Sequence, residues 1–325
     1  MRTITHPTFG EPQDVLTVED HELPQPGPGQ VRLRILLSPI HNHDLWTVRG
    51  TYGYKPELPA RAGTEAVGIV DALGADVEGL AVGQRVATGG SFGAWADYVT
   101  TPAAGLIPVP DSVSDEAAAQ LVAMPFSAIS LLESLHLEPG DWLVQNAANG
   151  AVGRMVAQLA AARGVNVLGL VRRADGVEEL RSQGIERVVA TSVESRRDEV
   201  ATITGGAPIK VGIESVGGKP AGEVLSLLAE NGELVVFGAM ASPTLELSSG
   251  DVIFKQATVR GFWGSKVSQS IDPALKQRLF GELLAAIGSG QLTLPVAGVF
   301  PFEQIAAAVE ASLTAGRVGK VLLRP

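Results

Sequence analysis

The stretch Asp141-Trp-Leu-Val-Gln-Asn-Ala-Ala-Asn-Gly-Ala-Val-Gly-Arg154 decides the fold, because it is typical of a strand, a tight turn and the start of a helix. Residues 142–145 form a short, mainly apolar run that follows a Pro-Gly turn. From Val152 onward, apolar residues recur at helical spacing until Gly164. Residues 165–171 are again apolar, which predicts a parallel strand covered on both faces.

The two glycines of this turn predict a dinucleotide site. A helix N-terminus behind a glycine turn presents free backbone N–H groups and the positive end of the helix dipole, which both suit a diphosphate. The run departs from the usual G-x-G-x-x-G pattern at Ala148, which replaces the first glycine. A plain glycine turn is the alternative, but the strand–turn–helix–strand context favours a dinucleotide. The residues expected at the cofactor here are Asn149, Gly150, Ala151, Val152 and Gly153.

The end of the second strand selects the cofactor. NAD sites usually place an acidic residue there to bind the ribose 2′-hydroxyl. This chain has Arg172 and Arg173 instead, and no acid before Asp175. Guanidinium groups match a phosphate in geometry and charge, so we expect NADPH, with both arginines at its 2′-phosphate. Two solvated arginines at a strand end are the alternative.

Composition narrows the classes of function. With 325 residues the chain is long enough for two domains. Its net charge of −10 argues against a general nucleic-acid or membrane-surface role, so we expect neither as a partner. The chain has no cysteine, which excludes disulfides, thiolate nucleophiles and cysteine-bound zinc. We see no signal peptide and no apolar run of transmembrane length, and therefore expect a cytoplasmic protein.

Two regions of different character follow each other. Residues 1–110 alternate short β-like runs with Gly/Pro turns, show no long helical pattern and predict a compact β-rich domain. Ser114, with acidic residues after it, is typical of a capped helix start. From there to about residue 258, helices and apolar strands alternate. This alternation predicts an α/β fold with a Rossmann-type, doubly wound parallel sheet.

The C-terminal part adds helices and a closing strand. Residues 272–288 and 302–315 have the pattern of amphipathic helices. Residues 319–323 are expected to form a last strand that returns to the sheet of the first domain. Ligands of open α/β sheets bind at the carboxyl ends of the strands, which adds three candidates for the cofactor site. They are Gly217, Gly238 and Met240.

Over nearly its whole length the chain resembles the zinc-independent members of the medium-chain dehydrogenase/reductase superfamily. The run Gly63-Thr-Glu-Ala-Val-Gly-Ile-Val70, followed by Gly83-Gln-Arg-Val86, is similar to the first-domain signature of that superfamily. Residues 148–153 match its nucleotide turn, and Ser215-Val-Gly-Gly218 matches a later strand-end motif.

The resemblance implies a division into two domains. A GroES-like catalytic and substrate domain would comprise residues 1–115 and 260–325, and a Rossmann NADPH-binding domain would comprise residues 116–259. Superfamily relatives often dimerise through the nucleotide domain. Residues 252–254 and 257–260, which we expect to be an apolar edge strand, therefore suggest a homodimer.

Two branches of the superfamily compete. The quinone oxidoreductases share the Gly-Thr-Glu run and the Val-Gly pair, but the mitochondrial-type 2-enoyl thioester reductases share more. Their additional matches are Gln145-Asn-Ala-Ala-Asn149, Tyr52-Gly, Pro56-Glu-Leu-Pro59, Phe254-Lys and Arg260-Gly-Phe-Trp263. We therefore favour an NADPH-dependent reductase of enoyl-CoA or enoyl-acyl-carrier-protein thioesters. The alternative is a reductase of quinones or enones, and a non-enzymatic NADPH-binding protein is a remote third.

The enoyl reductase resemblance also implies catalytic residues. Reduction requires hydride delivery to the β-carbon, stabilisation of an enolate oxygen and a proton for the α-carbon. Tyr52 matches the family's proton donor, with Tyr54 as a neighbouring rival. Trp263 matches a residue that lines the nicotinamide and acyl pocket and excludes water. His43 stands where alcohol dehydrogenases carry a proton-relay hydroxyl, and a histidine there suggests proton transfer near neutral pH.

The resemblance adds two candidate residues for the cofactor site and a prediction about metal binding. Ser127 matches a hydroxyl that approaches the nicotinamide in relatives, and Phe262 belongs to the same expected cofactor site. Zinc-dependent relatives carry Cys, His and Cys where our alignment places His41, Thr64 and Phe126. One ligand of three cannot hold a tetrahedral zinc ion, so we expect no metal.

Overall fold

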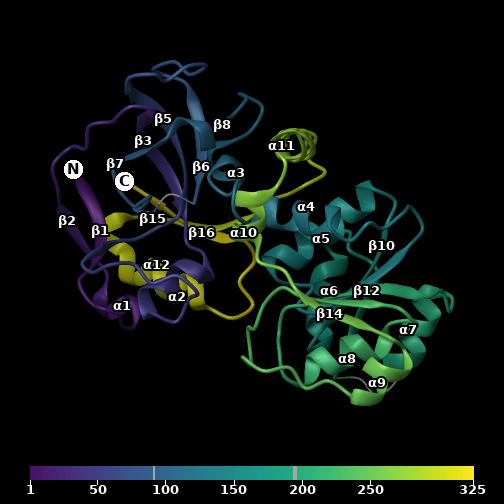
Figure 1. Ribbon diagram of the computed structural model, residues 1–325. Coiled ribbons are helices and arrows are strands. Elements are labelled where there is room, and N and C mark those ends of the chain that lie inside the picture. Colours follow the sequence, from purple (N-terminus) through teal and green to yellow (C-terminus); the bar gives the residue numbers. More distant parts are fainter. Residues whose placement is uncertain (91, 193–195) are drawn as a thin grey trace. The chain divides into compact units, whose positions relative to one another are not determined.

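The computed structural model describes residues 1–90, 92–192 and 196–325, which form two compact units (Figure 1). The first unit comprises Met1–Met124 and Phe280–Pro325, and the second comprises Pro125–Leu279. The sequence placed the divisions earlier, after residues 115 and 259. Residues 260–279 belong to the second unit because they begin with the last strand of its sheet and the helix that follows.

The first unit contains two sheets. A small one has the strand order β2-β1-β4 and consists of β1 (Arg2–His6), β2 (Thr17–Asp20) and β4 (Ala60–Arg61). The large one has the order β15-β16-β3-β5-β6-β8, with β7 also paired to β3. Its strands are β3 (Gln30–Pro39), β5 (Glu65–Leu73), β6 (Arg85–Gly89), β7 (Tyr98–Pro102), β8 (Ile107–Pro108), β15 (Val296–Pro301) and β16 (Lys320–Arg324).

Alternating burial explains the central strand of the large sheet. In β3, Val31, Leu33, Ile35 and Leu37 are buried, and the strand pairs antiparallel with β5. The closing strand β16 pairs antiparallel with β3, which confirms that the C-terminus returns to this sheet. The helices of the first unit are α1 (Pro12–Val15), α2 (Asn42–Arg49), α3 (Asp115–Ala118) and α12 (Ile305–Leu313), with 3-10 turns at Ala103–Gly105 and Phe302–Gln304.

The second unit is the predicted doubly wound parallel sheet. Its strand order is β11-β10-β9-β12-β13-β14, with all pairs parallel. The strands are β9 (Trp142–Gln145), β10 (Asn166–Val171), β11 (Val188–Ala190), β12 (Ile209–Glu214), β13 (Glu233–Val236) and β14 (Thr258–Gly261). The helices are α4 (Met124–Glu133), α5 (Ala151–Ala162), α6 (Ala174–Arg181), α7 (Arg196–Thr204), α8 (Lys219–Leu227), α9 (Ser249–Phe254) and α10 (Gly264–Ser270). Helix α11 (Pro273–Gly288) contains the division between the two units.

One sequence prediction about local structure was wrong, and one short helix was not predicted. The β-rich N-terminal region contains α2, whose start is fixed by Asp44 accepting a hydrogen bond from the His41 N–H and whose end is a left-handed Gly50. Residues 252–254 lie in α9, not in an edge strand, because Ser248 caps a helix by accepting from the Asp251 N–H.

The described part of the chain has no helix with both the length and the apolar character that a membrane span requires.

Candidate functional site

A cluster of buried polar side chains lies in the first unit, where α2 meets the start of β5. We call it the histidine cluster, and it consists of His41, His43, Asp44, Thr64 and Glu65. All are buried except His43, whose side chain is 19% exposed. The residue before Thr64, Gly63, has a φ of +89°, and a Cβ there would lie 2.3 Å from the ring of Trp95. Only glycine therefore allows the chain to enter β5 so close to the core.

The first half of the cluster is a chain of three hydrogen bonds that ends at a helix start. The Thr64 hydroxyl donates to Asp44 Oδ1 at 2.7 Å, and it lies 2.8 Å from His43 Nε2. Because the single hydroxyl hydrogen goes to the carboxylate, His43 must donate through Nε2–H. The other carboxylate oxygen of Asp44 accepts from the His41 N–H at 2.9 Å. The arrangement fixes the tautomer of His43 and leaves a lone pair on its Nδ1.

The second half joins His41 and Glu65. His41 Nε2 lies 2.6 Å from Glu65 Oε2, and Glu65 Oε1 accepts from the backbone N–H groups of Val122 and Ala123. The His41 ring stacks on His43, with centroids 4.9 Å apart and planes at 15°. The two halves of the cluster are thus in direct ring contact.

Burial shifts the pKa values of three members of the cluster. Desolvation lowers the pKa of His41 well below its usual value, and it also lowers the pKa of His43. Burial raises the pKa of Glu65 to about 8, although its two backbone hydrogen bonds act in the opposite direction. Burial lowers the pKa of Lys320, at the start of β16, to about 8. Near pH 7 these shifts favour the uncharged forms of His41, His43 and Glu65.

Two tyrosines follow α2, and they have different surroundings. The Tyr52 ring lies against His43, with centroids 5.8 Å apart and a tilt of 32°, and its backbone N–H binds the Trp46 carbonyl. Tyr54 is 43% exposed and stacks on Phe92, with centroids 4.4 Å apart. Only Tyr52 contacts the histidine cluster through its ring.

Tyr54 instead belongs to a groove on the first unit. The groove has a volume of about 650 Å³. It is lined by Tyr54, Lys55, Pro56, Glu57, Pro59, Ala60, Arg61 and Phe92. The aromatic pair gives the groove an apolar part, and two cationic side chains with one carboxylate, Glu57, give it a charged part.

In the second unit, residues on both sides of the nucleotide turn fix its conformation. Gly150 precedes α5 in an extended conformation, with no side chain capping the free N–H groups of the first turn. A Cβ at Gly153 would lie 2.7 Å from the Ala148 carbonyl oxygen, so the helix approaches the turn too closely for any other residue. The buried Gln145 amide donates to the Gly153 carbonyl at 2.7 Å. Ala148 fits in place of the usual glycine because Gly169 on β10 leaves room for its methyl group.

Arg154 is a supporting residue that the sequence analysis missed. Its side chain is 8% exposed, and its Nε donates to the carbonyl of Asn149 at 3.0 Å. The guanidinium also pairs with Glu179 and donates to Gln183. A buried arginine thus ties the exposed Asn149–Gly150 turn to the end of α6.

The two arginines after β10 are not equivalent. Arg173 makes a bidentate ion pair with Asp175, at 2.6 and 3.0 Å, which raises the pKa of the arginine. Arg172 is exposed and makes no side-chain hydrogen bond or ion pair with the described residues. Among the described residues, its guanidinium therefore has no contact to lose when it binds a ligand.

The other candidates in the second unit lie near the carboxyl ends of strands, in two groups. Gly217 has a φ of +80°, and its N–H donates to the buried Glu214 carboxylate at 2.7 Å. The backbone of Gly238 also lies against this turn, and the Met240 N–H binds the Ser215 carbonyl, with the Met240 side chain 54% exposed.

The second group surrounds the end of β14. Phe262 is buried and stacks on Phe237, with centroids 5.9 Å apart, whereas Trp263 begins α10 and is 48% exposed. Ser127 lies beside this segment, because a Cβ at Gly264 would come within 2.4 Å of the Ser127 hydroxyl. Trp263 and Phe262 therefore belong to the nucleotide-binding unit and not, as expected, to the β-rich one.

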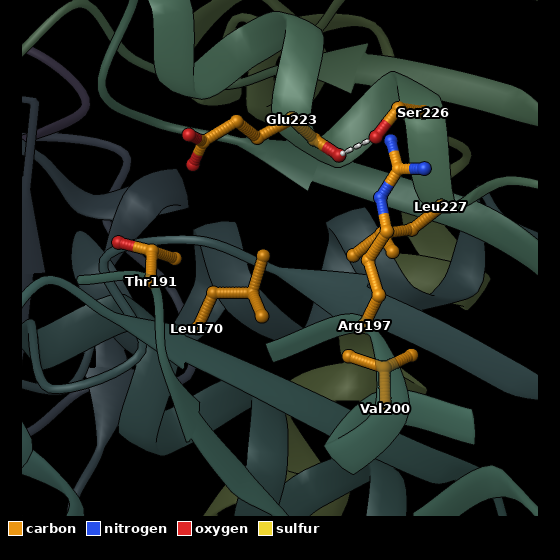
Figure 2. Close-up of a pocket in the computed structure, with 7 residues that line it drawn as sticks. All are labelled: Leu170, Thr191, Arg197, Val200, Glu223, Ser226 and Leu227. Carbon is orange, nitrogen blue, oxygen red and sulfur yellow. Dashed lines mark hydrogen bonds between the residues drawn. The ribbon is translucent and has the colours of Figure 1, made fainter. Parts of the chain in front are cut away.

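A small cavity elsewhere in the second unit contains none of the predicted residues. Figure 2 shows its lining from four elements or their ends: Leu170, Thr191, Arg197, Val200, Glu223, Ser226 and Leu227. Its volume of about 20 Å³ is roughly the room for one water molecule, so we do not consider it a ligand site.

The described residues contain no group of three His, Cys, Asp or Glu side chains placed to hold a metal ion. Two of the three positions aligned with zinc ligands, His41 and Thr64, are engaged in the histidine cluster.

Comparisons with known proteins agree with one another on the family that the chain resembles. Two family models match, the alcohol dehydrogenase GroES-like domain over residues 27–111 and the zinc-binding dehydrogenase model over residues 151–278. The human mitochondrial enoyl-[acyl-carrier-protein] reductase is 34% identical over 320 residues, covering 96% of this chain and 86% of that protein.

Solved structures extend the likeness to the quinone oxidoreductases. That of a Pseudomonas syringae quinone oxidoreductase is 28% identical with a TM-score of 0.88, over 100% of this chain and 99% of the other. A mycobacterial protein solved in complex with NADPH is 27% identical with the same TM-score of 0.88, over the whole of both chains.

Proposed function

Because this chain belongs to the mitochondrial-type enoyl-[acyl-carrier-protein] reductase family of the medium-chain dehydrogenase/reductase superfamily, we propose that it reduces 2-enoyl thioesters with NADPH. The observation that carries the proposal is the ring contact of Tyr52 with His43, at the edge of a buried polar cluster. The family motif around Tyr52 thus coincides with the one tyrosine in this segment that has a polar network behind it.

The nucleotide turn fits the proposed cofactor. The uncapped first turn of α5 offers backbone N–H groups to a diphosphate, and Gly153 keeps the approach free of a side chain. Arg172 is the cation available to a 2′-phosphate, with Arg173 beside it. NADPH bound here would supply the hydride for the β-carbon. We propose that Gly217, Gly238, Met240, Ser127 and Phe262 complete the cofactor site.

The protein's own part in the reaction is to position the acyl group and supply a proton. Hydride addition at the β-carbon places negative charge on the thioester oxygen, and the α-carbon then needs a proton. A phenol can first hydrogen-bond the developing enolate oxygen and then release its proton, which is the role we assign to Tyr52. We assign Trp263 the exclusion of water near the reacting atoms. The groove at Tyr54 and Phe92 has the volume and the cations for a long, phosphate-bearing thioester arm.

A substrate panel tests the proposal. Crotonyl-CoA and hexenoyl-CoA should consume NADPH, and Tyr52→Phe should lose most of this rate, by about 100-fold, while it still binds NADPH. Tyr98→Phe is the matched control and should keep its rate within about twofold, because its ring lies under the Arg32 guanidinium and it belongs neither to the cluster nor to the groove. Full activity in Tyr52→Phe would exclude the tyrosine from the mechanism.

The alternative function is reduction of quinones or enones, which the likeness to the Pseudomonas syringae quinone oxidoreductase favours. A quinone needs an apolar slot and access to the hydride, without a proton donor for a carbon atom. Rapid turnover of quinones together with poor turnover of enoyl thioesters would select this alternative. We further propose that either reaction proceeds without zinc.

We also propose a homodimer formed through the second unit. Strand β14 is an edge of the parallel sheet, and Ile253 and Phe254 in the preceding helix are 63% and 80% exposed. Phe254→Asp should shift the protein to a monomer in light scattering coupled to size-exclusion chromatography. Val82→Asp, at a position 64% exposed in the first unit, should not. A monomeric wild type would refute the dimer.

The compartment stays a prediction. The human enoyl-[acyl-carrier-protein] reductase is mitochondrial by its name, and this describes that protein only. Our expectation for this chain remains the cytoplasm.

A further inference from the structure

We propose that Asp44, Thr64 and His43 form a proton relay that restores the Tyr52 phenol after each turnover. The inference rests on the proposed function, because it assigns Tyr52 the proton that reaches the α-carbon. It adds two positioning residues, Asp44 and Thr64, that act on the reaction only through His43. The geometry that points to it is the continuous line from a buried carboxylate through a hydroxyl to an imidazole in contact with the phenol ring.

The hydrogen bonds of this line all donate in one direction, from His43 through Thr64 to Asp44. The Thr64 hydroxyl donates its single hydrogen to Asp44, and its oxygen therefore accepts a hydrogen bond from His43 Nε2–H. A proton that arrives at His43 Nδ1 makes an imidazolium whose Nε2–H remains bound to a hydroxyl polarised by Asp44. Asp44 Oδ1 also lies 3.6 Å from His43 Nε2, so the same carboxylate attracts the charge directly. The relay thus stabilises the cation that it has to form briefly.

The proton balance is simple. Tyr52 gives its hydroxyl proton to the α-carbon and becomes a phenolate. His43 takes one proton from solvent at Nδ1 and passes it to the phenolate oxygen, directly or through one water molecule. His43 then returns to its neutral form, and one solvent proton has been consumed for each hydride transferred. Because its side chain is 19% exposed, His43 is able to take this proton from solvent.

The charges around His43 suit a transient role. Desolvation and the buried Lys320 lower the pKa of His43, whereas Asp44 raises it. His41, stacked on the His43 ring, has a pKa well below its usual value, and Glu65 beside it keeps its proton up to a pH of about 8. His43 is therefore neutral at rest near pH 7. A negative charge appearing on Tyr52 is the change that would favour its protonation.

The relay also explains the residues at two former metal positions. The alignment puts Thr64 and His41 where zinc-dependent relatives carry ligands, yet here both side chains are bound within the cluster.

Thr64→Val removes the middle of the line without changing the shape of the side chain. We expect the first turnover, followed as a rapid burst of NADPH oxidation, to keep its wild-type rate because Tyr52 starts protonated. Steady-state turnover should fall by about tenfold or more, with KM and NADPH affinity within about twofold. The lost rate should depend on buffer concentration and rise with added imidazole, and Thr64→Ser should restore it. The rate of the valine variant should decline at lower pH than that of the wild type.

Thr3→Val is the matched control, because Thr3 carries a buried hydroxyl in the same unit without a hydrogen-bond partner. It should leave turnover and buffer dependence unchanged. If Thr64→Val does not fold, the same measurements are made on His43→Gln, because His43 lies at the partly exposed end of the hydrogen-bond line. Wild-type turnover without a burst or buffer effect in the folded variant would overturn the relay and leave the proposed function intact. A wild type that does not reduce enoyl thioesters would instead refute the proposed function itself.

Discussion

Replacement of Arg172 by Gln should weaken NADPH binding and leave NADH binding unchanged. The two cofactors differ only in the 2′-phosphate, and Arg172 is the arginine at the end of β10 with no side-chain partner among the described residues. Arg173 would have to give up or share its two hydrogen bonds to Asp175 before it could serve a phosphate fully. We therefore expect the larger effect at Arg172.

The structure sets the size of this effect. A hydrogen bond to a charged group contributes about 1.5–3 kcal/mol, and exposure to water at this strand end reduces that to about 1–2 kcal/mol. At about 1.4 kcal/mol for each factor of ten, the dissociation constant of NADPH should rise by about 5- to 30-fold. Arg173→Gln should have a smaller effect, and Asp175→Asn, which frees Arg173, should tighten NADPH binding.

Fluorescence titration of both reduced cofactors measures these constants, with kcat/KM for each cofactor as a second readout. Higher salt should diminish the NADPH preference, because it screens an exposed ion pair. Equal losses for NADPH and NADH in Arg172→Gln would mean that the arginine supports the fold and does not bind the 2′-phosphate. A wild type that prefers NADH would refute the argument from both arginines.

Two further predictions concern pH and metal. Burial raises the pKa of Glu65 to about 8, so between about pH 6.5 and 8 the folded state holds a proton that the unfolded chain has lost, and stability falls as the pH rises. Below the usual histidine pKa of 6.5, the lowered pKa values of His41 and His43 make stability rise with pH instead. Above pH 8, the lowered pKa of Lys320 also makes stability rise with pH. Thermal unfolding of Glu65→Gln should lack the decline between pH 6.5 and 8, and an unchanged decline would assign it to another group. Dialysis against EDTA should leave the reductase rate unchanged, since the described residues offer no group of three metal ligands; a loss of activity that added zinc restores would refute zinc independence.

Local patterns in the sequence were sufficient to predict the strand, turn and helix that open the nucleotide-binding unit. The apolar strand before residue 146, the Gly150–Gly153 turn and the helix after it are set by short-range rules of burial, glycine geometry and helical spacing, and the structure has each of them. The same rules missed α2, because its start depends on a histidine and an aspartate whose capping bond has no strong signature in the sequence. They also mistook residues 252–254 for a strand, since a short apolar run is compatible with either element.

The sequence alone therefore determined the α/β class, the parallel sheet with its glycine turn and the pair of arginines that points to NADPH. Tertiary structure decided which tyrosine lies against a histidine, which arginine is already paired, and how Thr64 comes to join Asp44 to His43. The physical reason is distance along the chain: Thr64 and His43 stand 21 residues apart. Their hydrogen bond exists only because the strands that follow and precede them pair across the sheet, and this pairing depends on the burial of the whole core.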